Sequence, residues 1–167
     1  MSATPEEIQE RPKEGGTRLR FQLVIDCRDP KLMTRFWTAA LGYELEPPPA
    51  GFATWDDYWR TLRVPEEELD GGSDSITDPT GRGPRIWFQK VEETKTTKNR
   101  LHLDLRASGG RSHPLEPIEI RKQKVEAEAA RFVALGATRI EVISDGTQLD
   151  HYAVAMSDPE GNEFDIN

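Results

Sequence analysis

The sequence predicts an α+β fold built from two similar halves, each running strand–helix–strand–strand–strand. Three matches in the same order indicate this internal repeat. The strand segments Arg20–Leu23 and Arg100–Leu103 start 80 residues apart, as do the Asp-Pro-x-Gly turns that begin at Asp78 and Asp158. Between them, an Ala-Leu-Gly sequence ends a helix in each half, at Gly42 and at Gly136. A half this small leaves one sheet face uncovered, so we expect the two halves to pair.

The first module is expected over residues 18–92, after a disordered tail at 1–17 that is rich in Glu, Pro, Gly and Lys. Alternation predicts a strand at 19–27, with Leu19, Phe21, Leu23 and Ile25 facing the core. Asp29-Pro30 starts a helix as N-cap and first-turn proline, and Gly42 ends it. Further strands are expected at 43–46, 75–77 and 85–91.

An inserted helix is expected near 54–63, because Thr54 and Asp57 resemble a capping box. Trp55, Tyr58, Trp59 and Leu62 then fall on one face at i, i+3, i+4 and i+7. This face packs either as a satellite cluster on the sheet, which we favour, or as a lid over a ligand.

The second module is expected over residues 98–167 and contains the same elements. A strand at 100–106 places Leu101, Leu103 and Leu105 on its core face, and a loop follows at 107–120. The predicted helix at 122–135 turns Val125, Ala129, Phe132 and Val133 inward. The remaining elements are a strand at 138–143, a turn at Asp145-Gly146, and a terminal hairpin of strands at 152–157 and 162–166.

Composition excludes several classes of function. The formal net charge of −8, with no basic run, argues against binding nucleic acid or an anionic membrane surface. No apolar stretch approaches the ~18 residues of a membrane span, and no signal peptide is apparent. A single cysteine, Cys27, forbids an intrachain disulfide and fits a reducing cytoplasm.

Five segments carry a family resemblance, and together they span roughly residues 18–167. They are the segment from Asp29 to Tyr43 with its F-W-x-x-A-L-G-Y ending, R-I-W-F-Q-K-V, K-N-R-L-H-L-D-L, A-x-R-F-V-A-L-G-A-T and S-D-P-E-G-N-E-F-D. In these the chain resembles the vicinal-oxygen-chelate (VOC) superfamily of glyoxalase I, bleomycin-resistance proteins and extradiol dioxygenases, and most of all bacterial glyoxalase-like domain proteins. The resemblance implies two paired βαβββ modules that form a curved, cavity-bearing mixed sheet with helices packed outside. It also implies a homodimer.

The resemblance further implies four metal-ligand positions, which fall on Gln22, Trp87, His102 and Asp165. Trp87 departs from the pattern, because an indole has no available lone pair for a metal. We therefore expect no cofactor. The alternative is a divalent metal (Zn, Ni, Mn or Fe) on the reduced set Gln22, His102 and Asp165.

The same strand faces predict polar walls for a ligand cavity. The candidate ligand-binding residues are Gln22, Trp87, Gln89, His102, Asp104, Arg106, Glu163 and Asp165. Trp87 suits stacking on a planar or aromatic ligand, and His102 beside Asp165 suits proton transfer as the one candidate catalytic residue.

Three functions follow from these features. The first is metal-independent binding of a small molecule in the cavity. The second is a metal-dependent lyase, isomerase or dioxygenase, which stoichiometric metal in the purified protein would favour. The third is a non-catalytic interaction protein that docks through the aromatic inserted helix, which a filled or collapsed cavity would favour.

Overall fold

A computed structural model describes residues 20–69, 71–108, 116–144 and 151–167. The tail expected at 1–17 and the turn expected at Asp145-Gly146 lie outside these residues. The helices are α1 (Pro30–Leu41), α2 (Trp55–Thr61) and α3 (Ile118–Leu135), with a short 3₁₀ helix at Glu66–Glu68. The strands are β1 (Leu23–Cys27), β2 (Glu44–Leu45), β3 (Ser75–Thr77), β4 (Ile86–Lys90), β5 (Leu103–Leu105), β6 (Thr138–Ser144), β7 (Tyr152–Ser157) and β8 (Glu163–Ile166).

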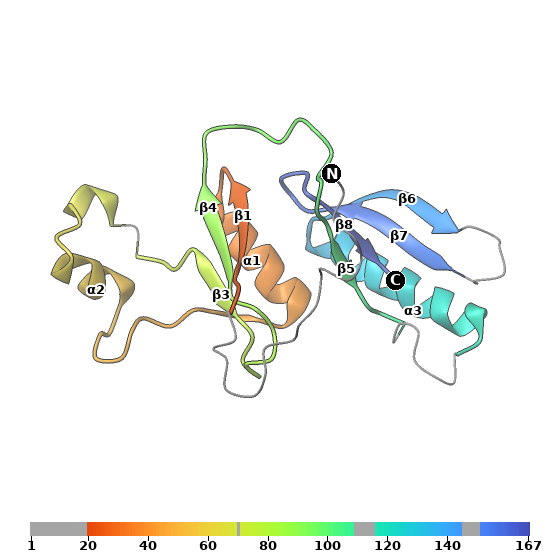
Figure 1. The fold of residues 1–167 in the computed structure, drawn as a ribbon, viewed down its shortest axis with the longest axis horizontal. Helices are drawn as coiled ribbons and strands as arrows, with labels where there is room; N and C mark the ends of the chain where they lie inside the picture. The colour runs from red at the N-terminus through yellow and green to blue at the C-terminus, as the bar shows by residue number, and fades with distance from the viewer. Residues whose placement is uncertain (1–19, 70, 109–115, 145–150) are drawn as a thin grey trace, which may run out of the picture.

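The described strands form two four-stranded sheets of identical topology, in the orders β1-β4-β3-β2 and β5-β8-β7-β6 (Figure 1). In each sheet the first strand pairs in parallel with the fourth, and the remaining pairings are antiparallel. This equivalence confirms the predicted pair of βαβββ modules. The two sheets are separate, and β1 and β5 are edge strands of the first and the second sheet, respectively.

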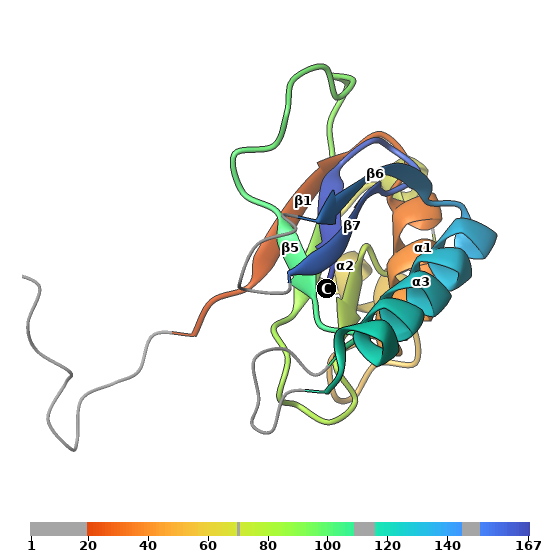
Figure 2. The same cartoon turned by 90° about the vertical axis from the view of Figure 1, so that its right-hand side faces the viewer.

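Helices α1 and α3 cover one side of the strands (Figure 2). Asp29 caps α1 by accepting a hydrogen bond from the Leu32 N–H at 2.9 Å. Gly42 and Gly136 end the two helices with left-handed backbone conformations, as the Ala-Leu-Gly repeats predicted.

The two modules share one hydrophobic core. The Trp37 ring of α1 lies 5.3 Å from the Phe164 ring of β8, and Phe36 lies 6.0 Å from Phe132 of α3. The turn after β7 also binds the first module. Its Glu160 carboxylate accepts hydrogen bonds of 2.7 Å from the backbone N–H groups of both Arg28 and Asp29.

Three expectations about the core are wrong. Phe21 and Leu101 were placed on core faces but are 78% and 88% exposed, because β1 and β5 begin only at Leu23 and Leu103, beyond these residues. Val133 is also exposed, although Val125, Ala129 and Phe132 of the same helix are buried as expected. Helix α3 begins at Ile118, inside the segment expected to be a loop.

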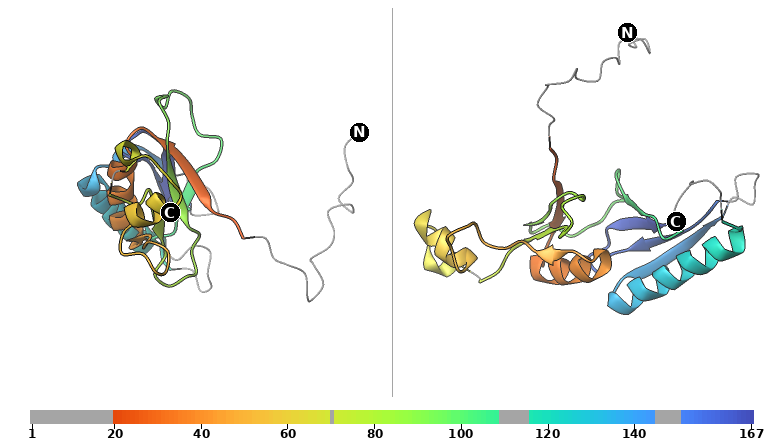
Figure 3. Two further views of the ribbon diagram at one scale, coloured as in Figure 1. Left: turned by 90° about the vertical axis from the view of Figure 1, so that its left-hand side faces the viewer. Right: turned by 90° about the horizontal axis from the view of Figure 1, so that it is seen from below.

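Helix α2 stands at the end of the molecule beyond α1 (Figure 3). Thr54 caps it by accepting a hydrogen bond from the Asp57 N–H at 3.1 Å, as half of the predicted capping box. The aromatic rings pack on each other, with Trp55 stacked on Trp59 at 5.4 Å and edge-on to Tyr58 at 5.9 Å. None of its residues is fully buried, so the rings pack on one another and not on the sheet, where the satellite cluster was expected.

Candidate functional site

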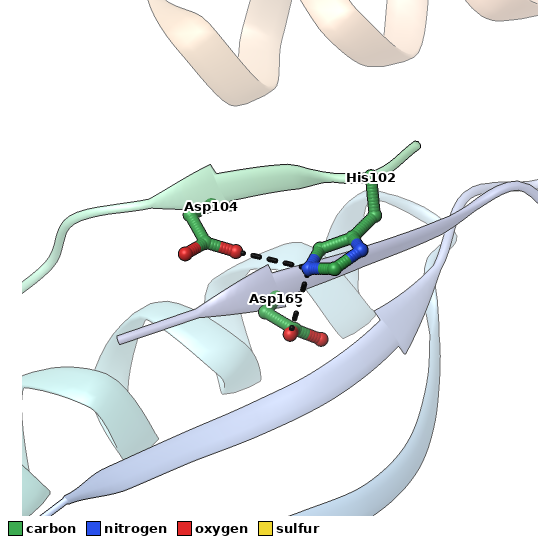
Figure 4. Close-up of side chains that lie close together, drawn as sticks. All are labelled: His102, Asp104 and Asp165. Atoms are coloured by element: carbon green, nitrogen blue, oxygen red, sulfur yellow. Dashed lines mark ion pairs between the residues drawn. The ribbon is translucent and has the colours of Figure 1, made fainter. Parts of the chain in front are cut away.

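Three side chains of the second module converge on its open sheet face. His102 directly precedes β5, Asp104 lies within β5, and Asp165 lies opposite Asp104 on β8. The His102 Nε2 atom is 3.3 Å from the Asp104 Oδ1 atom and 3.5 Å from the Asp165 Oδ2 atom (Figure 4). Parallel pairing of β5 with β8 puts both carboxylates on the same side of the sheet, and the residue two before Asp104 points the same way.

Burial is the largest influence on the pKa of Asp165 in this cluster. Burial raises the pKa of Asp165, and the negative charge of Asp104 raises it further, whereas His102 opposes the shift. Asp165 is the most enclosed of the three, with 22% of its side chain exposed against 47% for His102 and 56% for Asp104. The cluster can therefore hold a cation or an oriented imidazole while staying open to solvent.

The corresponding face of the first module carries a different network. Arg85 Nη1 donates to Gln22 Oε1 at 2.8 Å, while Arg85 Nε and Nη2 form a two-point ion pair with Glu46 at 2.8 and 2.6 Å. Ser75 Oγ accepts a further bond from Arg85 at 2.7 Å. Gln22 is therefore engaged by Arg85, whereas His102 lies against Asp104 and Asp165.

Trp87 and Gln89 lie on β4, opposite Val24 and Asp26 of β1 respectively. Trp87 is half-buried on the open face of the first sheet. The strand registers also test the mapping made from sequence. Since Val24 pairs with Trp87 as Asp104 pairs with Asp165, Trp87 and Asp165 occupy equivalent positions in the repeat.

Glu163 and Arg106, the last two predicted site residues, are not part of the cluster of His102, Asp104 and Asp165. Glu163 forms an ion pair with Lys95 at 3.0 Å and accepts a hydrogen bond from the Asn99 N–H at 2.9 Å. Burial opposes ionisation of Glu163, but these two partners outweigh it and lower its pKa. Arg106 is exposed and borders an open hollow of about 610 Å³ that it shares with Asp104 and Arg131.

A cavity of about 240 Å³ lies where the two modules meet, between β1 and the segment leading into β5. Its apolar walls come from both modules and include Leu23, Ile25 and Leu103, with Trp37 and Phe164 beneath. Of the predicted site residues, His102 and Glu163 border it. A larger hollow of about 640 Å³ lies at Arg28, Lys90 and Glu160, away from His102.

Sequence reasoning missed Asp158 as a residue of this cavity. It was interpreted only as part of a turn, yet it borders the cavity and is 2% exposed. Burial raises its pKa, although N–H groups of Asn162 and Glu160 oppose the shift. Asp158 Oδ2 also accepts a 3.4 Å hydrogen bond from Trp37 Nε1, across the junction of the modules. An Asp-Pro-x-Gly turn gives no signal in sequence for such a position.

Among the described residues, no helix combines the length and the apolar character needed to cross a membrane.

Comparison with known proteins gives a family and a set of structural relatives. The family model of the glyoxalase-like domain matches residues 22–167. A search of curated proteins finds no match.

Solved structures share the fold at low identity. A glyoxalase/bleomycin resistance protein/dioxygenase family enzyme from Burkholderia phytofirmans PsJN is 18% identical with a TM-score of 0.52, covering 87% of this chain and 94% of its own. The fosfomycin resistance protein FosX from Listeria monocytogenes is 10% identical with a TM-score of 0.53, covering 90% and 93%. A mutant of the same FosX, solved with Mn(II) and dihydroxypropylphosphonic acid, is 11% identical with a TM-score of 0.52, covering 87% and 86%.

Proposed function

The chain belongs to the glyoxalase-like domain family, and from that premise we propose that it binds a small organic molecule in the cavity between its two modules. The observation that carries this proposal is the composition of the cavity wall. Leu23 and Ile25 of the first module and Leu101 and Leu103 of the second line this cavity of about 240 Å³. Small-molecule sites are typically concave and mostly apolar, with few polar groups that fix orientation.

The polar groups at this cavity stand at its border. They are Asp26, Asn99, His102, Asp158, Asn162 and the ion-paired Glu163. An apolar ligand body inside, with a hydrogen-bonding group directed at His102, matches this distribution.

Trp87 supports a planar or aromatic ligand. It pairs across the first sheet with Val24, which lines the cavity. A ligand that extends from the cavity past Val24 would therefore meet the indole face, where stacking adds to burial of apolar area.

A thermal-shift screen of small organic compounds, followed by calorimetric titration of those that stabilise the chain, tests the proposal. A ligand of the folded state alone raises the apparent stability. Leu101 borders the cavity and is 88% exposed, so Leu101→Trp should block the cavity without harming folding. We expect at least a tenfold loss of affinity.

Leu62→Trp is the matched control. Leu62 is 55% exposed and directly follows α2, away from the cavity, so affinity should stay unchanged. Full binding in the Leu101→Trp variant, or no stabilising compound in a broad screen, would contradict the proposal.

A metal-dependent lyase, isomerase or dioxygenase is the second candidate, because His102, Asp104 and Asp165 gather three ligand atoms within 4.8 Å of one another. In such an enzyme His102 or a neighbouring carboxylate could also move a proton. Loss of turnover in both His102→Ala and Asp165→Asn, once a substrate is found, would favour it over simple binding.

The homodimer and the cytoplasmic location stay predictions. Size-exclusion chromatography with light scattering tests the dimer, which requires twice the chain mass of 18.9 kDa.

A further inference from the structure

The charged side chains at the cavity between the modules are mostly carboxylates. Among the described residues that line it, Asp26, Asp158 and Glu163 are acidic, and none is Lys or Arg. Lys95 lies 3.0 Å from Glu163 and neutralises that carboxylate alone. We infer that the ligand of this cavity is an organic cation, a protonated amine on a small apolar body, with its positive charge against Asp158 and Asp26. This inference rests on the proposed function and adds a charge to the ligand proposed there.

Asp158 is a buried carboxylate without a charged partner. It is 2% exposed, and its hydrogen-bond donors are all neutral. They are the backbone N–H groups of Glu160 and Asn162 at 3.0 and 2.9 Å, the Asn162 amide at 3.0 Å and the Trp37 indole at 3.4 Å. Burial raises the pKa of Asp158, and the donors that oppose this shift carry no charge. Buried charges in proteins are usually paired, so a cation in the cavity would supply the missing partner.

Asp26 brings a second negative charge to the same side of the cavity. Its side chain is exposed and forms no ion pair with any of the described residues. Glu160, in the turn that begins at Asp158, accepts a hydrogen bond from the Arg28 N–H, two residues after Asp26. The turn therefore lies at the end of β1 that holds Asp26. The cationic side chains of Arg28 and Lys90 border the separate hollow at Glu160.

His102 does not reverse the charge of the cavity. Its Nε2 atom lies 3.3 Å from Asp104 and 3.5 Å from Asp165, so these two carboxylates outweigh even a protonated imidazole. The rings of Trp37 and Phe164 also line the cavity, and aromatic faces attract a cation. The volume of about 240 Å³ lies below the ~300–1,000 Å³ of typical ligand sites, which restricts the ligand to a small amine.

Three probes that share an apolar body and differ in charge test this inference on the full-length chain. They are phenethylamine, phenethyl alcohol and phenylacetate, each titrated calorimetrically at pH 8, where an alkylamine carries its proton. We expect the amine to bind at least tenfold more tightly than the alcohol. The acid should bind more weakly than either, because the carboxylates of the cavity repel it.

Asp26→Asn removes one charge at an exposed position, so the variant should fold normally. We expect its affinity for the amine to fall at least fivefold and its affinity for the alcohol to change by less than twofold. Glu67→Gln is the matched control. It makes the same change in net charge at an exposed position of the 3₁₀ helix that follows α2, and affinity for the amine should stay within twofold.

Asp158→Asn makes the same change at the buried carboxylate and should lower affinity for the amine at least tenfold. Circular dichroism and thermal unfolding check that this variant is folded, and Asp26→Asn decides the outcome if it is not. Binding of the alcohol or the acid as tightly as the amine would overturn the inference, and so would equal losses in the Asp26→Asn and Glu67→Gln variants. Only neutral or anionic ligands from the broad screen would overturn it too, whereas a screen without any ligand contradicts the proposed function itself.

Discussion

Substitution of Phe164 tests whether the two modules are stabilised by one shared hydrophobic core. Its ring is 1% exposed and lies 5.3 Å from Trp37 of the first module and 5.3 Å from Phe132 of the second. Phe164→Ala removes the ring from between them, and core Phe→Ala substitutions cost about 3–5 kcal/mol. That is a large part of the roughly 5–15 kcal/mol that stabilises a typical domain.

Urea unfolding followed by tryptophan fluorescence and by circular dichroism measures this loss. Both probes should give one coincident transition in the wild-type chain, because Trp37 is buried against the other module. For a domain of this size, a loss of 3–5 kcal/mol lowers the melting temperature by roughly 6–20 °C.

Phe21→Ala is the control, because its ring is 78% exposed and should contribute within about 0.5 kcal/mol. A loss below about 1 kcal/mol for Phe164→Ala would refute the shared core. Two separate transitions in the wild-type chain would refute it as well, since they would mean that the modules unfold independently.

Two further predictions concern ionisable groups. Arg139 pairs with Glu126 through two contacts of 2.6 and 2.8 Å, and together with the Tyr152 hydroxyl it lowers the pKa of Glu126 from 4.5 to about 2, against the effect of burial. A lowered folded-state pKa stabilises the fold above pH 4.5, and this contribution is lost as the pH falls towards 2. The stability gap between wild type and Glu126→Gln should therefore narrow from pH 7 to pH 2.5 in urea titrations, and a constant gap would contradict the ion pair. Burial, with neighbouring carboxylates led by Glu160, raises the pKa of Cys27 to about 12, so native protein at pH 8 should resist a thiol reagent that labels it fully in denaturant. Rapid labelling of the native chain would show that Cys27 is accessible.

The repeat was predictable because it depends on local chemistry. Gly42 and Gly136 adopt φ angles of 69° and 114°, which favour glycine, so the helix ends could be located in sequence. The alternation of side chains also placed His102, Asp104 and Asp165 on one face correctly, because the period of a strand is two.

Strand ends and long-range partners were not predictable in the same way. Leu101 continues the alternation of Leu103 and Leu105, but alternation does not say where pairing stops, and the chain leaves the sheet before Leu103. The bond from Arg85 to Gln22 joins residues 63 positions apart. No local pattern encodes this contact, so the sequence could not show that the Gln22 oxygen was engaged.

The two modules share a similar core and differ on their open faces. Leu23 with Ile86 in the first module corresponds to Leu103 with Phe164 in the second, and all four side chains are apolar. On the opposite face, Trp87 replaces the carboxylate found at Asp165. Packing restricts a core position in both copies alike, whereas an open sheet face can change in one copy at little cost in stability. The first module can therefore present the aromatic surface of Trp87 beside the Arg85–Glu46 ion pair, while His102, Asp104 and Asp165 gather in the second, so that a ligand between them would contact both.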